Sequence, residues 1–132
     1  MKAEKQRALV AEELLETERS YARSLHVVVD VFMKPLRTAS QAARAGVSAA
    51  SVDLVFAHWL PLTALHDELL AQLERRIGGD AWHSAACVGD VISGIVPYLR
   101  MYTAYVDAFD DSAAAVAKWN RSHRATQVLQ VL

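Results

Sequence analysis

Two carboxylates near the start of the chain, Glu13 and Glu18, have side chains and spacing suited to binding a partner. They belong to residues 8–25, a stretch without glycine or proline that predicts an amphipathic helix. At about 100° per residue, Glu13 falls at one edge of the apolar stripe of this helix and Glu18 at the other, whereas Glu12 and Glu16 point away from it. The predicted stripe, which we expect to face the core, consists of Val10, Leu14, Tyr21, Leu25, Val28 and Phe32.

A simpler interpretation of the two acids is structural. Carboxylates at the edge of a helix commonly form weak local pairs with nearby bases, here Arg19 or Arg23. The position of Glu18 favours a bond inside a helical bundle. By position alone, both acids can touch a neighbouring helix or a partner that docks on the exposed flank of this one.

Other reactive side chains give no catalytic or metal site. His58 and His66 are eight residues apart, too far to share one ion without a third ligand, so we expect His66 to pack in the core and no metal to bind.

Cys87 is the only cysteine, which excludes an internal disulfide, and we expect it to be buried. The sequence contains no glycine-rich phosphate loop, nucleophile elbow or paired-carboxylate motif, so we expect neither covalent chemistry nor a cofactor. Tyrosines 98, 102 and 105 recur at helical spacing and predict packing.

Composition indicates a single all-α domain over residues 1–132. Hydrophobic residues make up 53% of the chain, and five glycines and three prolines are too few for a turn-rich β fold. The formal net charge of −1 gives no general reason to bind nucleic acid or an anionic membrane, so either would have to be recognised locally. The sequence contains no membrane-spanning run and no signal-peptide core, which favours the cytoplasm.

Four helical segments are predicted. The first covers residues 4–36 and ends near Pro35. Residues 38–47 predict a loose connection, after which Ser48 or Ser51 caps a second helix that breaks near Leu60 because of Pro61 and ends at Gly78. A short third segment is expected around residues 82–86, and a last helix runs over residues 88–117 with a bend at Pro97. Tyr21 and Trp59 are expected in the shared core.

The first helix carries a recognisable motif. Residues 13–21 read Glu-Leu-Leu-Glu-Thr-Glu-Arg-Ser-Tyr, with Leu25 one turn later and Pro35-Leu36 at the helix end. This pattern resembles the first conserved region of the Dbl-homology domain, which is found in guanine-nucleotide exchange factors for Rho-family GTPases.

A second part of the chain agrees with the same family. The matching segments are residues 52–59 (Val-Asp-Leu-Val-Phe-Ala-His-Trp), 65–74 (Leu-His-Asp-Glu-Leu-Leu-Ala-Gln-Leu-Glu), 88–92 (Val-Gly-Asp-Val-Ile) and 97–106 (Pro-Tyr-Leu-Arg-Met-Tyr-Thr-Ala-Tyr-Val). Their order and spacing resemble the second conserved region of the Dbl-homology domain. The resemblance extends over residues 7–119.

The resemblance implies a function without covalent chemistry. Such a domain binds the switch regions of a Rho-family GTPase more tightly when nucleotide and magnesium are absent, so by linkage it weakens nucleotide binding and promotes GDP release. Glu13 is implied to bind switch I, and Thr17 and Glu18 of the same motif are the further candidates for GTPase binding. The alternative is a helical protein-interaction module on the same scaffold, without exchange activity.

The family's third conserved region has no counterpart before Leu132. We therefore interpret the chain as the N-terminal portion of a Dbl-homology domain, an elongated helical bundle that is partial. Such a portion is expected to exchange nucleotide poorly and to self-associate through an exposed core.

Overall fold

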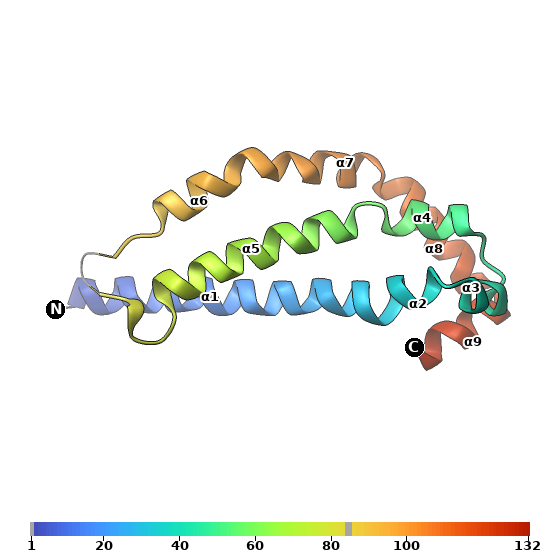
Figure 1. The fold of residues 1–132 in the computed structure, drawn as a ribbon, viewed down its shortest axis with the longest axis horizontal. Coiled ribbons are helices and arrows are strands. Elements are labelled where there is room, and N and C mark those ends of the chain that lie inside the picture. Colours follow the sequence, from blue (N-terminus) through green and yellow to red (C-terminus); the bar gives the residue numbers. More distant parts are fainter. Residues whose placement is uncertain (1, 84–85) are drawn as a thin grey trace.

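The longest rod of the molecule begins at Lys2 and ends at Leu36, close to the bounds predicted from the sequence. In the computed structural model, which describes residues 2–83 and 86–132, it comprises α1 (Lys2–Val27), a π-helical segment (Val28–Met33) and α2 (Lys34–Leu36). Figure 1 shows this rod running along the length of an elongated molecule. The wide turn precedes Pro35, whose ring would collide with the carbonyl four residues earlier in a regular α-helix.

The connection predicted at residues 38–47 is instead a capped helix, α3 (Ala39–Ala45). The Thr38 side chain accepts a hydrogen bond from the Gln41 N–H at its start, and Gly46 ends it in the left-handed conformation, with φ 68°. The prediction was wrong because an alanine-rich segment has no apolar periodicity, although it has the highest helix propensity.

The second predicted helix is divided into α4 (Ala49–Phe56) and α5 (Trp59–Ile77). Of the two predicted caps, Ser48 is the one that caps α4, by accepting a hydrogen bond from Ser51 N–H at 3.1 Å. The expected break lies just before Trp59, which places Pro61 in the first turn of α5, where a missing N–H removes no helical bond. Helix α5 ends at Ile77 before the Gly78-Gly79 pair, also as predicted.

The C-terminal part of the chain is more segmented than predicted. It contains α6 (Gly89–Ile95), a 3-10 turn (Val96–Arg100) that includes Pro97, and α7 (Met101–Asp107), followed by α8 (Phe109–Arg121) and α9 (His123–Val131). The bend at Pro97 is therefore confirmed. Of the short segment expected at residues 82–86, residues 84 and 85 lie outside the described part, Trp82 and His83 are not helical, and the Ala86 N–H donates to the His83 carbonyl at 2.9 Å.

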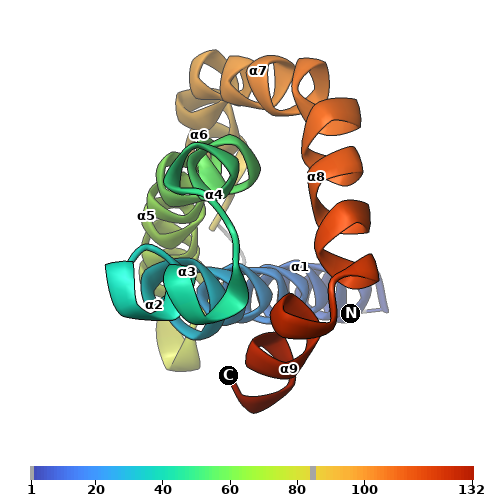
Figure 2. The same ribbon diagram turned by 90° about the vertical axis from the view of Figure 1, so that its right-hand side faces the viewer.

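The helices form two adjacent cores. Helix α1 packs along α5, which packs against α6, and this core is made by Ala11, Leu15, Leu65, Leu69, Leu73, Ile77, Val91 and Ile95. The second core lies where α3, α4, α8 and α9 meet the end of the long rod, and its largest members are Met33, Leu36, Phe56 and Trp119. Figure 2 shows α1, α5, α7 and α8 arranged around the long axis. The described residues contain no strand, so the all-α prediction is confirmed.

The buried face of the rod lies one position away from the predicted stripe. Leu25 is buried, but Val10 is 55% exposed and Tyr21 38% exposed, so their placement in the core was wrong. Trp59 is half-buried. The buried residues are Ala11, Leu15, Ala22, Leu25, Val29, Met33 and Leu36. Small alanines allow α1 and α5 to approach closely, whereas a hydropathy stripe gives most weight to bulky side chains.

None of the described helices is, taken singly, both long and apolar enough to cross a membrane. The pair Ala39–Ala45 and Ala49–Ile77, bent by 100°, meets the length and composition criteria only when its two parts are counted together.

Candidate functional site

The three residues implied to bind a GTPase lie on different faces of α1. Glu13 and Thr17 are exposed on its outer side. Glu18 points into the bundle, where its side chain is 12% exposed and its Oε1 lies 2.7 Å from Nδ1 of His66 on α5. The predicted internal bond of Glu18 is thereby confirmed. The structure does not bring Glu18 together with Glu13 and Thr17 on one accessible surface.

Glu18 begins a chain of polar contacts that joins three helices. Nε2 of His66 lies 2.6 Å from the hydroxyl of Tyr102 on α7, and that hydroxyl lies 2.6 Å from the hydroxyl of Tyr21 on α1. The pattern fits a His66 ring whose Nδ1 donates to the Glu18 carboxylate and whose Nε2 accepts from the Tyr102 hydroxyl. Sequence reasoning predicted that His66 packs in the core, and it is 8% exposed.

This chain of contacts is suited to positioning helices and poorly suited to proton transfer. Burial, followed by the hydrogen bond with Tyr21, raises the pKa of Tyr102 well above its usual range, so its phenol keeps its proton at neutral pH. The rings of Tyr21 and His66 make an edge contact at 4.6 Å, and Tyr102 contacts His66 at 5.8 Å. Aromatic packing continues to Tyr105, which lies 5.8 Å from Trp59. The network fixes the register of α1, α5 and α7.

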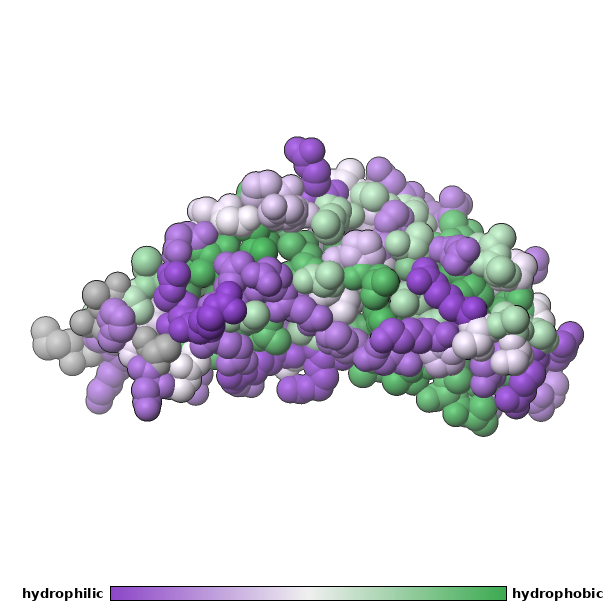
Figure 3. All heavy atoms as spheres, in the orientation of Figure 1, coloured by the Kyte–Doolittle hydropathy of each residue, from purple (hydrophilic) through white to green (hydrophobic). Residues whose placement is uncertain are grey.

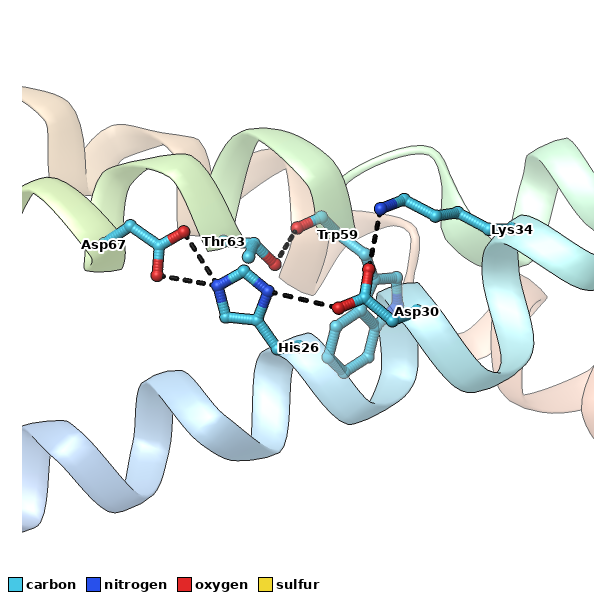
Figure 4. A network of polar contacts seen from close by, with 6 residues as sticks. All are labelled: His26, Asp30, Lys34, Trp59, Thr63 and Asp67. Atoms are coloured by element: carbon cyan, nitrogen blue, oxygen red, sulfur yellow. Dashed lines mark hydrogen bonds and ion pairs between the residues drawn. The ribbon is translucent and has the colours of Figure 1, made fainter.

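A second polar network, which the sequence analysis missed, joins α1 to α5 near the π-helical segment (Figure 4). Nε2 of His26 lies 2.8 Å from both carboxylate oxygens of Asp67, and Nδ1 lies 3.5 Å from Asp30. Asp30 in turn accepts a hydrogen bond from Lys34 at 2.7 Å. The i, i+4 spacing of His26, Asp30 and Lys34 was visible in the sequence, but the contact with Asp67 needs the fold.

Both ring nitrogens of His26 face carboxylates, which is the arrangement that a doubly protonated imidazole satisfies. The hydrogen bond with Asp67 is the main cause that raises the pKa of His26 above its usual value. The hydrogen bond from Lys34 similarly lowers the pKa of Asp30. This network is therefore sensitive to pH.

Two arginines brace α5 against its neighbours. Arg19 donates through Nε and a terminal nitrogen to the Glu74 carboxylate, each at 2.6 Å, and it also binds Glu16. The hydrogen bond with Glu74 is the main cause that raises the pKa of Arg19. Neither Glu13 nor Glu18 forms the local pair with Arg19 that the structural interpretation suggested. At the other end of α5, Arg76 binds Asp90 at 2.7 and 2.9 Å.

Cys87 is exposed, so its predicted burial was wrong. Its backbone carbonyl accepts a hydrogen bond from Arg76 at 2.6 Å, while the neighbouring Ala86 occupies the buried position. In the described part of the chain no group of three or more His, Cys, Asp or Glu residues is arranged to hold a metal ion.

An apolar hollow of about 310 Å³ lies beside the second core, where the π-helical segment, α4, α5 and α8 meet. Aromatic and branched side chains line it, among them Val28, Phe32, Phe56, Trp59 and Trp119. Several other large apolar residues are exposed on α6, α7 and the turn between them, including Val96, Tyr98 and Val106. The molecule therefore presents apolar surface suited to contact with another element or chain.

Comparison with known proteins gives one family. The model of the RhoGEF domain matches residues 10–132. The chain is 32% identical to the human FYVE, RhoGEF and PH domain-containing protein 2 over 111 residues. These residues make up 83% of this chain and 16% of that protein. It is 32% identical over 123 residues to protein 4 of the same series from Rattus norvegicus, covering 92% of this chain and 15% of that protein.

A relative with a different name gives the same result. The Rho guanine nucleotide exchange factor osg-1 of Caenorhabditis elegans is 33% identical over 120 residues, which cover 89% of this chain and 10% of that protein. The chain thus spans less than a fifth of the length of these relatives. No solved structure matches it.

Proposed function

This chain belongs to the RhoGEF family, and from that premise we propose that it binds a Rho-family GTPase through the outer face of α1 and promotes GDP release. The observation that carries the proposal is the accessibility of Glu13 within the family motif. Glu13 is exposed, and in the described part of the chain it has no hydrogen bond or ion pair, so its carboxylate is available to a partner.

The division of roles within the motif follows from burial. Glu18 is committed to His66 and cannot reach a partner without breaking the bundle, so its part is to hold α1 in place. Thr17 is exposed one turn from Glu13 and adds a hydroxyl to the same surface. We assign direct binding to Glu13 and Thr17 and a positioning role to Glu18.

The mechanism is one of linked binding. A surface that binds the switch regions best in the nucleotide-free GTPase lowers nucleotide affinity by the same factor. Glu13 contributes by holding switch I away from the arrangement that supports magnesium. No bond is made or broken in the GTPase in this mechanism.

The test compares the same substitution at two adjacent positions, Glu13 and Glu12. Glu13→Ala should weaken binding to a nucleotide-free Rho-family GTPase, and slow release of a fluorescent nucleotide, by roughly tenfold or more, because a charge-assisted hydrogen bond contributes about 1.5 to 3 kcal/mol. Glu12→Ala is the control: Glu12 is exposed too, but it lies beside Leu15 and Trp82 on the flank of α1.

Equal binding by the two variants, across a panel of Rho-family GTPases, would refute the assignment of Glu13. Binding without accelerated nucleotide release by the unmodified chain would support the alternative function, an interaction module without exchange activity.

We also propose that the chain self-associates when it is isolated. The apolar hollow beside Phe32 and Trp59, together with the exposed Val106 and Phe109, leaves surface that water solvates poorly. Light scattering should show a mass that increases with concentration. A monomer at all concentrations would contradict this proposal.

A further inference from the structure

The small net charge hides a strong separation of charge. Residues 31–52 and 112–132 contain six of the fourteen lysines and arginines and none of the fifteen aspartates and glutamates. The remaining residues hold eight bases and fifteen acids, a formal charge of −7. The two basic segments meet in space, because α3 packs on α9 at one end of the molecule (Figure 1).

Three cations lie around the C-terminus of α3, and a fourth follows them on α8. Arg124 of α9 donates to the carbonyl of Ala43 at 2.7 Å, and its guanidinium lies close to Gly46. Arg44 lines the same hollow as Arg124. Lys118 lines a neighbouring hollow that also includes Gly46, and Arg121 follows one turn later on α8. We call Arg44, Lys118, Arg121 and Arg124 the basic end.

The charge of the basic end is not neutralised within the molecule. Lys34 and Arg37, the other bases of these segments, lie near Asp30 and Asp53, at 2.7 and 3.8 Å. In the part of the chain that the structure describes, Arg44, Lys118 and Arg121 have no ion-pair partner, and all three are exposed. The positive potential is therefore directed to solvent.

Apolar surface accompanies these charges. Val131, which is 75% exposed, lines the hollow that contains Arg44 and Arg124. In Figure 3 an apolar patch lies at the lower right, over the region that α9 occupies in Figure 1, with hydrophilic side chains beside it. Clustered cations next to exposed apolar side chains are typical of surfaces that rest on lipid.

The same cluster is a poor fit to single-stranded RNA. Proteins of that kind stack bases on exposed aromatic rings. The aromatic residues of the two basic segments are Phe32, which is half-buried, and Trp119, which is 6% exposed, so no fully exposed ring is available there for stacking. We propose that the basic end binds the anionic surface of a lipid bilayer. This goes beyond GTPase binding and involves a different part of the molecule from Glu13.

Vesicle flotation with the full chain tests the proposal. Vesicles of phosphatidylcholine and phosphatidylserine in equal parts should bind the protein, and pure phosphatidylcholine vesicles should not. The triple variant Arg44→Gln, Lys118→Gln, Arg121→Gln should bind about a hundredfold more weakly, because each cation near an anionic leaflet contributes about fivefold. Binding by the unmodified chain should also fall as salt is raised.

The control is a variant with the same change in net charge: Lys2→Gln, Lys5→Gln, Arg75→Gln, three exposed bases far from the basic end in sequence. It should bind vesicles as the unmodified chain does, and circular dichroism should show both triple variants folded. The proposal is overturned if phosphatidylserine has no effect, if the two triple variants lose binding equally, or if a single-stranded RNA binds more tightly than the anionic vesicles. Because no GTPase is present, failure here leaves the exchange proposal unaffected.

Discussion

The inner and outer faces of α1 carry residues of the same motif with opposite roles. On the inner face, Glu18 is 12% exposed and bound to His66, and Leu25 is 3% exposed. On the outer face, Glu13 and Thr17 meet solvent. The comparison shows that one short motif combines a bond that fixes the helix with a surface that a partner can reach, so loss of function at its positions has two distinguishable causes.

The largest effect is expected from the apolar part of the inner face. Leu25→Ala should lower the free energy of unfolding by about 2 to 5 kcal/mol, because it removes a buried side chain and leaves a cavity. Val10→Ala, at a position 55% exposed, should change it by less than about 0.5 kcal/mol. Urea unfolding of both variants measures the difference. Similar losses would show that the stripe predicted from the sequence is the true inner face.

The next effect concerns the polar part of the inner face. Glu18→Ala should destabilise by about 1 to 3 kcal/mol, because the Nδ1–H of buried His66 loses its acceptor. Glu13→Ala should cost only tenths of a kcal/mol. Thermal unfolding followed by circular dichroism separates them. If Glu18→Ala lowers GTPase binding without lowering the melting temperature, Glu18 is a contact residue and the division between the faces fails.

A smaller effect is expected at the boundary between the faces. Tyr21→Phe removes one hydroxyl and should cost about 0.5 to 1.5 kcal/mol, through loss of the 2.6 Å contact with Tyr102. The ring contact with His66 is kept. Tyr102→Phe removes two contacts of the same network and is expected to cost more. Equal melting temperatures for Tyr21→Phe and the unmodified chain would show that the network ends at Tyr102.

The smallest effect is a dependence on pH. The pKa of His26 is raised in the fold, mainly by Asp67, so the protonated ring stabilises the native state. This stabilisation is complete below the unfolded pKa of about 6.5 and is lost as pH rises through the higher folded pKa. Since the His26 side chain is 44% exposed, the change should not exceed about 1 kcal/mol. Melting temperatures of the unmodified chain and His26→Gln, measured from acidic to alkaline pH, should converge as pH rises; parallel curves would contradict this.

The sequence predicted where helices begin and end better than it predicted which face of a helix is buried. Pro35, Ser48 and the Gly78-Gly79 pair punctuate the chain through local backbone chemistry, and each predicted boundary was confirmed. The face of α1 depends on which neighbour packs against it, and Ala11 and Ala22 give no strong hydropathy signal. Local rules therefore predict where helices end but not how they are rotated.

The candidate site shows the same limit. The internal bond of Glu18 was predicted from its place beside the apolar stripe. Its partner, His66, was not predicted, because the two residues lie 48 positions apart in the sequence. The contact of His26 with Asp67 spans 41 positions and had no local signal beyond the i, i+4 pattern. The accessible Glu13 was identified through the family motif, since an exposed carboxylate looks like any other from sequence alone.

Because of the π-helical segment, the two parts of the long rod present differently rotated faces to their neighbours. Lys34 N–H donates to the carbonyl of Val29, five residues back, so the turn holds about one residue more than an α-helical turn. One extra residue advances every later side chain by about 100° around the axis. The rod can therefore pack on α5 in its first part and on α3 beyond Met33 without twisting as a body. Deleting a single residue at the wide turn would rotate the later part of the rod by about 100° relative to the first part. Each half would keep its helix, but the buried side chains of the rod could no longer reach both cores at once.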